Sequence, residues 1–326
     1  MNARLAEAAC LLLALCSVAM APARAQQDYP NHPIRLVVPF APAGVTDTSA
    51  RVLADKLARV MGQQVLVDNR PGASGNIGTQ QVALGPADGY TLLLAFDGTM
   101  VINPFVFPKI PFDTLRDFAP VTKMGDAALL VAVHPSVPAK NLAELVAYSK
   151  ANPGKLSFGH SGTGGTTHVA GELLKQRTGL DMTSIPYKSG GQAVADCIGG
   201  QVPVVYSAVA GAQAYIKSGR LNAIGISTPK RLPSLPNVPT FIEQGVAGFE
   251  VASWVGIMVP VKTPRAIIDK LNHDLGITLH DPELVARYET LGIDVVANSP
   301  EQFGEQIKAD LARWSRVVEA AKIRVD

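Results

Sequence analysis

The pattern of apolar and polar residues changes within residues 34–60, and the change predicts a strand, a short loop and a helix. Residues 34–38 form a short apolar run, which is typical of a buried strand in a parallel sheet. Apolar residues then recur from position 50 to position 60 at the spacing of one buried helix face. Small side chains dominate residues 39–47 between them, so a ligand can approach the backbone there.

The same succession of strand and helix continues along the chain and predicts an α/β fold with parallel sheets. Further strands are expected at residues 65–67, 90–95, 129–133, 156–159, 185–187, 202–207, 221–227 and 251–259, with a separate short strand at Val121. Helices are expected at residues 76–84, 169–177, 192–198 and 212–217, from residue 142 onwards, and behind Pro264, Pro282 and Pro300, each of which follows a capping residue. Residues 228–238 are rich in proline and predict a surface connection.

The strand–loop–helix plan occurs in two parts of the chain, which predicts two α/β domains. Domain 1 is expected to comprise residues 26–124 and 251–326, and domain 2 residues 125–250. Ligands of open α/β sheets bind beyond the carboxyl ends of the strands, so we expect a cleft there that closes on a small solute. The loops expected at this cleft are residues 40–47, 70–76, 96–99 and 161–168.

The first 25 residues have the pattern of a secretory signal peptide. Arg4 precedes an almost wholly apolar run over residues 8–20, and Ala23-Arg24-Ala25 follows as an A-x-A cleavage signature. The apolar run is too short to span a bilayer comfortably. We therefore expect a signal peptide at residues 1–25, cleavage near Ala25 and export to the periplasm.

Three cysteines occur in the chain, and two of them lie in the expected signal peptide. Lipidation at Cys16 is disfavoured, because Leu15 stands where a small residue is expected. Cys197 alone would remain after cleavage, so the mature chain would have no internal disulfide. Its apolar helical surroundings predict a buried, inert thiol.

Composition and charge argue against two classes of partner, nucleic acids and anionic membrane surfaces. Of the 326 residues, 47% are hydrophobic and 17% are charged, and the formal net charge is +2. This balance gives no reason to expect a nucleic acid or an anionic membrane surface as partner. We expect a monomer with a full hydrophobic core in each domain.

No catalytic or metal-binding pattern accompanies the predicted loops. Ser161 and His168 lack the G-x-S-x-G elbow of a serine hydrolase. His160 and His168 are eight residues apart without other clustered ligands, which argues against zinc. Neither small-residue loop continues as Gly-Lys-Ser/Thr, which excludes a nucleotide P-loop. We therefore expect no enzyme activity, no metal and no cofactor.

An anionic ligand suits these loops better. Thr46 or Asp47 can cap the helix after the first loop, and a helix N-terminus favours an anion. Hydroxyl groups in the loop at residues 161–168 can donate hydrogen bonds to it. Phe40 and Trp254 can form walls of the cleft or belong to the core.

Several motifs, taken in order over nearly the whole mature chain, carry a family resemblance. They are YP (29–30), PIRLVVPF (33–40), DNRPG (68–72), GNIG (75–78), DGYTL (88–92), INP (102–104), DFAPV (117–121), PYK (186–188), GGQV (199–202) and VPT (238–240). With them the chain resembles the substrate-binding proteins of tripartite tricarboxylate transporters, the Bug-type periplasmic solute receptors. The resemblance implies a type II periplasmic-binding-protein fold and a small organic carboxylate held between two α/β domains.

Delivery of the carboxylate to a two-component membrane permease is also implied, with ligand sensing for a membrane signalling partner as the alternative. Both roles use the same closed surface, so the residues leave them open. In the family, the loop after the first strand and a Gly/Ser/Thr loop of the second domain hold one carboxylate. The residues expected to bind ligand are Phe40, Ala43, Gly44, Val45, Thr46, Asp47, Asp97, Thr99, Ser161, Thr163, Gly164, Gly165, Thr166, Thr167, His168 and Trp254.

Three departures from the family pattern concern the carboxylate contacts. Ala43-Gly44 stands where a Gly-Gly pair is usual, and Gly165 replaces a hydroxyl residue. Asp97 stands where small or hydroxyl residues are commoner. It predicts either a partner for an amino group on the ligand or, as the simpler reading, a solvated turn residue that caps the next segment.

Overall fold

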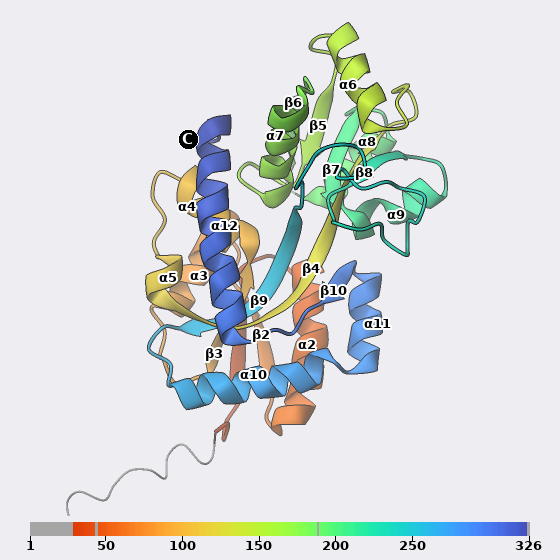
Figure 1. Cartoon of the computed structure of the whole chain (residues 1–326). Coiled ribbons are helices and arrows are strands. Elements are labelled where there is room, and N and C mark those ends of the chain that lie inside the picture. The colour runs from red at the N-terminus through yellow and green to blue at the C-terminus, as the bar shows by residue number, and fades with distance from the viewer. Residues whose placement is uncertain (1–28, 43–44, 188, 325–326) are drawn as a thin grey trace, which may run out of the picture.

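The computed structural model describes residues 29–42, 45–187 and 189–324, with only the backbone of Val45, and it shows a mixed α/β protein (Figure 1). Its strands form two sheets that share one long strand, β4 (Phe118–Val133). The order of the hydrogen-bonded strands is β2-β1-β3-β9-β4-β7-β5-β6, while β8 and β10 pair with β4 from the side. The predicted signal peptide and residues Ala43 and Gly44 lie outside the described residues.

The first sheet contains the earliest predicted strands. Strand β1 (Ile34–Val38) pairs in parallel with β2 (Val65–Asn69) and with β3 (Thr91–Phe96). Strand β9 (Ala252–Pro260) then runs antiparallel between β3 and β4. The short strand β10 (Ile293–Val295), which the sequence pattern did not predict, pairs with the middle of β4.

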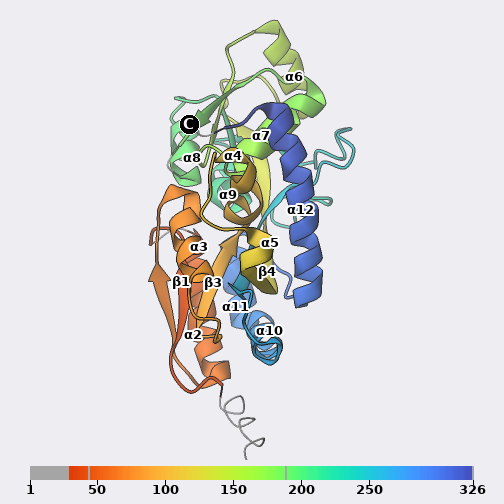
Figure 2. The same cartoon turned by 90° about the vertical axis from the view of Figure 1, so that its left-hand side faces the viewer.

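The second sheet repeats the parallel arrangement. Strand β5 (Ser157–His160) pairs in parallel with β6 (Thr183–Pro186) and β7 (Val204–Ala208). Strands β7 and β8 (Asn222–Ile226) run antiparallel to the second half of β4. Both sheets therefore place the carboxyl ends of their parallel strands toward the middle of the molecule (Figure 2).

Strand β4 replaces the two separate strands expected at Val121 and at residues 129–133. It runs for 16 residues without a break and bends through register shifts opposite β9. Its first part pairs with β9 and β10 and its last five residues with β7 and β8, so one strand joins the two sheets. The domain boundary expected at residue 125 falls inside this strand, and the division into two domains stays a prediction.

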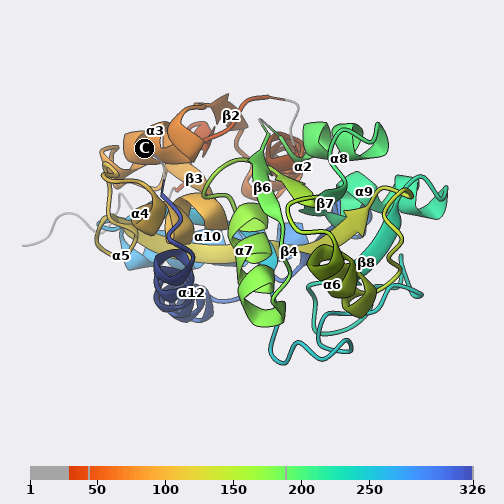
Figure 3. The same cartoon turned by 90° about the horizontal axis from the view of Figure 1, so that it is seen from above.

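Helices cover the outer faces of both sheets (Figure 3). Those from the first part of the chain are α2 (Val45–Met61), η2 (Ala73–Gly75), α3 (Asn76–Ala83), the π-helix η3 (Gly98–Ile102), α4 (Asn103–Val106), α5 (Thr114–Asp117) and α6 (Leu142–Ala151). The later ones are α7 (Thr166–Thr178), α8 (Gly190–Ile198), α9 (Val209–Lys217), α10 (Arg265–Leu279), α11 (Pro282–Thr290) and α12 (Pro300–Ala321). Helix α12 runs along β4 and touches both α4 and α7.

The expected helix starts are partly confirmed. Asp281 caps α11, and Ser299 caps α12 in a capping box with Gln302. The prediction for Pro264 was wrong, because α10 begins one residue later and the hydroxyl of Thr263 donates to the carbonyl of Pro260 instead. Thr46 and Asp47 are not caps either: they lie inside the first turn of α2, which begins at Val45.

Apolar faces predicted by the helical spacing pack into continuous cores. Leu53 and Leu57 of α2 lie fully buried against β1, and Phe303 and Ile307 of α12 pack beside β9. Cys197 is buried, and burial raises the pKa of its thiol to about 12. The predicted burial of Cys197 is thus confirmed, and its raised pKa disfavours the reactive thiolate.

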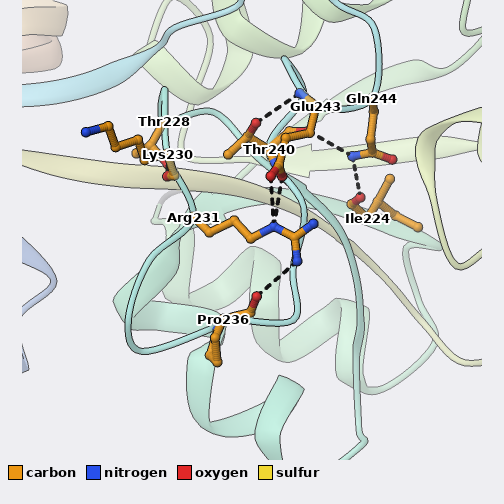
Figure 4. Close-up of polar contacts among 8 residues, drawn as sticks. All are labelled: Ile224, Thr228, Lys230, Arg231, Pro236, Thr240, Glu243 and Gln244. Atoms are coloured by element: carbon orange, nitrogen blue, oxygen red, sulfur yellow. Dashed lines mark hydrogen bonds and ion pairs between the residues drawn. The ribbon is translucent and has the colours of Figure 1, made fainter.

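The proline-rich connection after β8 is held by one ion pair (Figure 4). The guanidinium Nε of Arg231 lies 2.9 Å and 3.0 Å from the two carboxylate oxygens of Glu243, and Nη1 donates to the carbonyl of Pro236. Glu243 also accepts from the backbone N–H of Thr240, and Gln244 Nε2 donates to the carbonyl of Ile224. These bonds tie the connection to the edge of the second sheet.

Candidate functional site

A cavity of about 370 Å³ lies where the carboxyl ends of parallel strands from the two sheets meet. It is called the hydroxyl-lined cavity below. Each of the lining residues given below either follows the end of β1, β2, β3, β5 or β6 or, as Phe96 does, ends the strand itself, as expected for an α/β sheet. The lining residues are Phe40, Ser74, Phe96, Gly98, Thr99, Asn103, Ser161, Gly162, Thr163, Gly165 and Tyr187.

Part of the predicted site is brought together here. Phe40 and Thr99 come from the first sheet, and Ser161, Thr163 and Gly165 come from the second. Six lining residues were not among the predicted ligand-binding residues, namely Ser74, Phe96, Gly98, Asn103, Gly162 and Tyr187, although Phe96, Gly98 and Gly162 lie in loops that were expected at the cleft. A signal for Ser74 existed, since residues 70–76 were already expected at the same sheet edge.

The loop after β5 is shaped by Thr167. The hydroxyl of Thr167 accepts a hydrogen bond from the backbone N–H of Ser161 at 3.1 Å and shares another with the hydroxyl of Ser161 at 2.8 Å. The N–H of Gly165 donates to the carbonyl of Gly162, which closes the turn. Thr167 itself is buried and lies behind the cavity wall rather than in it.

Two stacked histidines hold the same loop from behind. The rings of His160 and His168 lie 4.2 Å apart, centroid to centroid. His160 Nδ1 lies 3.0 Å from the carbonyl of Gly162, and the N–H of Gly164 donates to His168 Nδ1 at 3.1 Å. Gly164 is buried with a positive φ of 78°, which favours glycine. His168 and Gly164 thus support the loop rather than line the cavity.

Both histidines are neutral at physiological pH. Burial, together with the neighbouring ring of His168, lowers the pKa of His160 to about 3, and burial lowers the pKa of His168 to about 4. Within the described residues, no group of three metal-ligating side chains comes together. The pair therefore fixes the backbone of the loop by hydrogen bonds of neutral rings.

The first-sheet wall of the cavity is built around Ser74. The carbonyl of Ser74 accepts from the hydroxyl of Thr99 at 2.8 Å and from Asn103 Nδ2 at 3.0 Å. Ser74 has a φ of 54°, in the left-handed region, so its carbonyl turns toward η3 and α4. Phe40 and Phe96 pack edge to face with centroids 5.3 Å apart and supply the apolar side of the cavity.

Asp97 is not the solvated turn residue that the simpler reading predicted. It is 1% exposed, so it is no solvated turn residue, and no side-chain bond of its own caps η3. Its carboxylate accepts hydrogen bonds from the hydroxyls of Thr166 at 2.8 Å and Ser253 at 2.7 Å. Asp97 and Thr166 therefore form a bridge inside the cavity wall.

Other predicted site residues lie away from this cavity. Asp47 is 3% exposed and accepts from Arg51 Nε at 3.0 Å and from Asn69 Nδ2 at 2.9 Å. Thr46 precedes it in the first turn of α2, and its carbonyl accepts from Ser49. Their bonds fix the start of α2 beside β2. The side chain of Val45, like Ala43 and Gly44, is not among the described parts of the chain.

Trp254 lines a different cavity, of about 290 Å³, on the α12 side of β4 and β9. Its Nε1–H donates to Asp310 at 2.9 Å, and its ring packs edge to face on Phe303. This second space is called the charged cavity below. Its lining residues are Asp97, Lys123, Asp126, Ser227, Thr228, Pro229, Glu250, Val251, Ala252, Trp254, Gln306, Asp310, Arg313 and Trp314.

Over the part of the chain that the structure describes, no helix has the length and apolar character needed to cross a membrane.

A family model and a curated relative match this chain over most of its length. The model, described as the tripartite tricarboxylate transporter family receptor, matches residues 49–323. Protein BugT of Bordetella pertussis is 37% identical over 291 residues, which cover 89% of this chain and 89% of that protein.

Two solved structures share the fold and contain carboxylates. An R. palustris protein with adipate is 33% identical with a TM-score of 0.83, covering 91% of this chain and 100% of that one. MatC from Rhodopseudomonas palustris with bound malate is 30% identical with a TM-score of 0.79, covering 89% of this chain and 100% of that one. The expected periplasmic-binding-protein fold is confirmed by these likenesses.

Proposed function

Because this chain belongs to the receptor family of the tripartite tricarboxylate transporters, we propose that it captures a small organic carboxylate in the hydroxyl-lined cavity and delivers it to a membrane permease. The observation that carries the proposal is the chemistry of the cavity wall. Among the residues that the structure describes, its lining consists of hydroxyl, amide, aromatic and glycine residues and includes no lysine, arginine, aspartate or glutamate.

A carboxylate can be held in such a cavity by neutral donors. Hydrogen bonds to a charged group are worth about 1.5–3 kcal/mol each before desolvation is subtracted. The hydroxyls of Ser161 and Thr167 share one bond, and when Thr167 donates it, the Ser161 hydroxyl keeps its own proton for a ligand in the cavity. The hydroxyl of Thr163 and the N-terminal end of α7, which begins at Thr166, add further donors.

The size of the cavity and the position of the two sheets fit a small solute. A volume of about 370 Å³ lies within the usual range of small-molecule sites, about 300–1,000 Å³. We propose that the two sheets close on the ligand by bending of β4, the strand that joins them. Closure is favoured only as far as the ligand binds the closed form better than the open one.

Export and delivery complete the proposal. The predicted signal peptide would place the mature chain in the periplasm, where a receptor of this family meets its permease. Disruption of the gene should then abolish uptake of the captured carboxylate, and expression of the intact chain should restore it. Normal uptake without the receptor would contradict delivery.

The test of capture is thermal unfolding of the mature protein against a panel of mono-, di- and tricarboxylates, including adipate and malate. A ligand that binds only the folded state raises the melting temperature as its concentration rises. The matched controls are the uncharged amides of the same acids, which should give no shift. The protein is first unfolded and refolded to remove any co-purified ligand. If no acid of the panel then raises the melting temperature, the carboxylate site is overturned.

A further inference from the structure

Asp97 lies in the wall that separates the hydroxyl-lined cavity from the charged cavity. Its neighbours Phe96 and Gly98 line the first cavity, whereas its own side chain lines the second. Thr166, one of its two hydrogen-bond partners, follows Gly165 of the first cavity directly. Asp97 and its partner Thr166 are thus each adjacent in sequence to residues that line the hydroxyl-lined cavity.

Two hydroxyl groups, rather than a cation, stabilise this carboxylate. Thr166 Oγ1 lies 2.8 Å from Oδ2 and Ser253 Oγ lies 2.7 Å from Oδ1. Among the described side chains, no lysine or arginine contributes to the electrostatics of Asp97, and Asp310 on α12 adds a repulsive carboxylate. His168 lies in the first turn of α7, two residues after Thr166, and it is neutral because burial lowers its pKa to about 4.

The cations of the charged cavity are already engaged with other partners. Lys123 Nζ, from β4, lies 2.7 Å from Asp126 and 3.0 Å from Gln306. Arg313, from α12, donates to the carbonyl of Glu250 just before β9. Among its lining residues, the carboxylates Asp97, Asp126, Glu250 and Asp310 outnumber the cations Lys123 and Arg313.

We propose that capture of an anion in the hydroxyl-lined cavity is coupled to the uptake of one proton by Asp97. This inference rests on the proposed function. A carboxylate bound beside Gly98 and Gly165 brings a second negative charge close to a buried one that has no cation partner, and protonation of Asp97 removes the repulsion. The proton comes from solvent and forms an O–H bond on Asp97, which then donates to a hydroxyl that previously donated to it.

The direction of the pH dependence follows. Burial is the main cause that raises the pKa of Asp97 to about 7, and the bonds from Ser253, Thr166 and the N–H of Gly98 lower it less. Below about pH 6 the carboxyl is already largely neutral, so Asp97 should add no further pH dependence to the affinity. Above about pH 7 each further pH unit should weaken anion binding by up to about tenfold, until the pKa of the complex is reached.

The test is isothermal titration calorimetry of the mature protein with adipate and with malate, in two buffers of different ionisation enthalpy. Near about pH 8 the intact protein should take up close to one proton per anion, and its affinity should fall about tenfold between about pH 6.5 and about pH 8.5. Asp97→Asn mimics the protonated carboxyl, so its binding should lose both the proton uptake and the pH dependence. Asp310→Asn, the matched carboxyl on α12, should keep both. Binding without proton uptake by the intact protein would overturn the proposal.

A second measurement is independent of any ligand. The ¹³C carboxyl resonance of Asp97 in the ligand-free protein should titrate near pH 7, and a transition near pH 4, the ordinary value for aspartate, would equally overturn the proposal. Failure of the proposed function looks different, since neither probe would then bind at any pH while this resonance would still titrate near pH 7. If Asp97→Asn does not fold, the proton count of the intact protein and this titration decide.

Discussion

The hydroxyl-lined cavity and the charged cavity lie on either side of Asp97 and differ in whether charged side chains line them. The lining of the first, as far as the chain is described, consists of residues without formal charge, although the proposed ligand is an anion. The second is lined by Lys123, Arg313 and several carboxylates, and these side chains bind one another or nearby backbone groups.

The difference shows that a charged lining is not what identifies a site for a charged ligand. A buried charge must be paired or hydrogen-bonded, so charges inside a wall tend to engage each other. Lys123 bonds to Asp126 and Gln306, and Asp310 accepts from Trp254. Hydroxyl groups and helix N-termini do not need an opposite charge as a partner, so they can still donate hydrogen bonds to a bound carboxylate.

The largest expected effect comes from giving the hydroxyl-lined cavity a charge of its own. Thr163→Asp places a carboxylate beside the proposed ligand and should weaken carboxylate binding at least about 100-fold, or roughly 3 kcal/mol. Thr163→Asn is the neutral control of nearly equal size and should lose less than about tenfold. Titration calorimetry on both variants measures this, and equal affinities would place the anion elsewhere.

Removing a charge from the other cavity should affect folding and leave ligand affinity alone. Lys123→Met leaves Asp126 without its partner in a pair whose side chains are 8% and 29% exposed, and should cost about 2–3 kcal/mol of unfolding free energy. Arg265→Met, at an exposed pair with Asp269, should cost much less, because solvent screens that pair. Urea unfolding gives both values. A tenfold loss of carboxylate affinity in Lys123→Met would show that the charged cavity takes part in binding.

The smallest effect is the change of stability with pH that is caused by His160, one of the two histidines behind the hydroxyl-lined cavity. The pKa of His160 in the folded protein, about 3, lies below that of an unfolded histidine, so the unfolded state binds protons first as pH falls. Stability should therefore decrease below about pH 6.5, by about 2 kcal/mol for this residue at about pH 5.

His160→Phe should flatten that decrease, whereas His280→Asn, at an exposed position on the first sheet's side, should leave it unchanged. Urea unfolding at several pH values measures the slopes. Identical slopes in the intact protein and His160→Phe would show that His160 is protonated in the folded state. The buried carboxyls of Asp97 and Asp310 act in the opposite direction, because their raised pKa values favour the folded state at low pH.

Much of the local structure was predictable because its causes are local. The apolar run at residues 34–38 became β1 with the predicted bounds, and the residue before Pro300, Ser299, caps α12 as predicted. The loop after β5 was expected at the site because parallel strands end at one edge of their sheet, and Ser161, Thr163 and Gly165 do line the cavity.

Features that depend on distant partners escaped the sequence pattern. The residues between Val121 and residue 129 look polar and irregular, yet they belong to one continuous strand because β9 and β10 supply hydrogen bonds on its two sides. Ser74 contributes to the cavity because Thr99 and Asn103 bind its carbonyl from another segment. Trp254 could have belonged to either the cleft or the core, and its bond to Asp310 places it on the far side of β9.

The sequence alone determined most of the succession of strands and helices, the small-residue loops at strand ends and the family, since these depend on periodicity, caps and motifs within short stretches. Only the tertiary structure decided which loop residues share a cavity and which become supports behind it. Asp97 illustrates the reason: its residue type predicts a solvated carboxylate, but Thr166 and Ser253, 69 and 156 residues away, enclose it and give it two hydrogen bonds. Burial and partners of that kind arise from packing between distant segments, which no local pattern records.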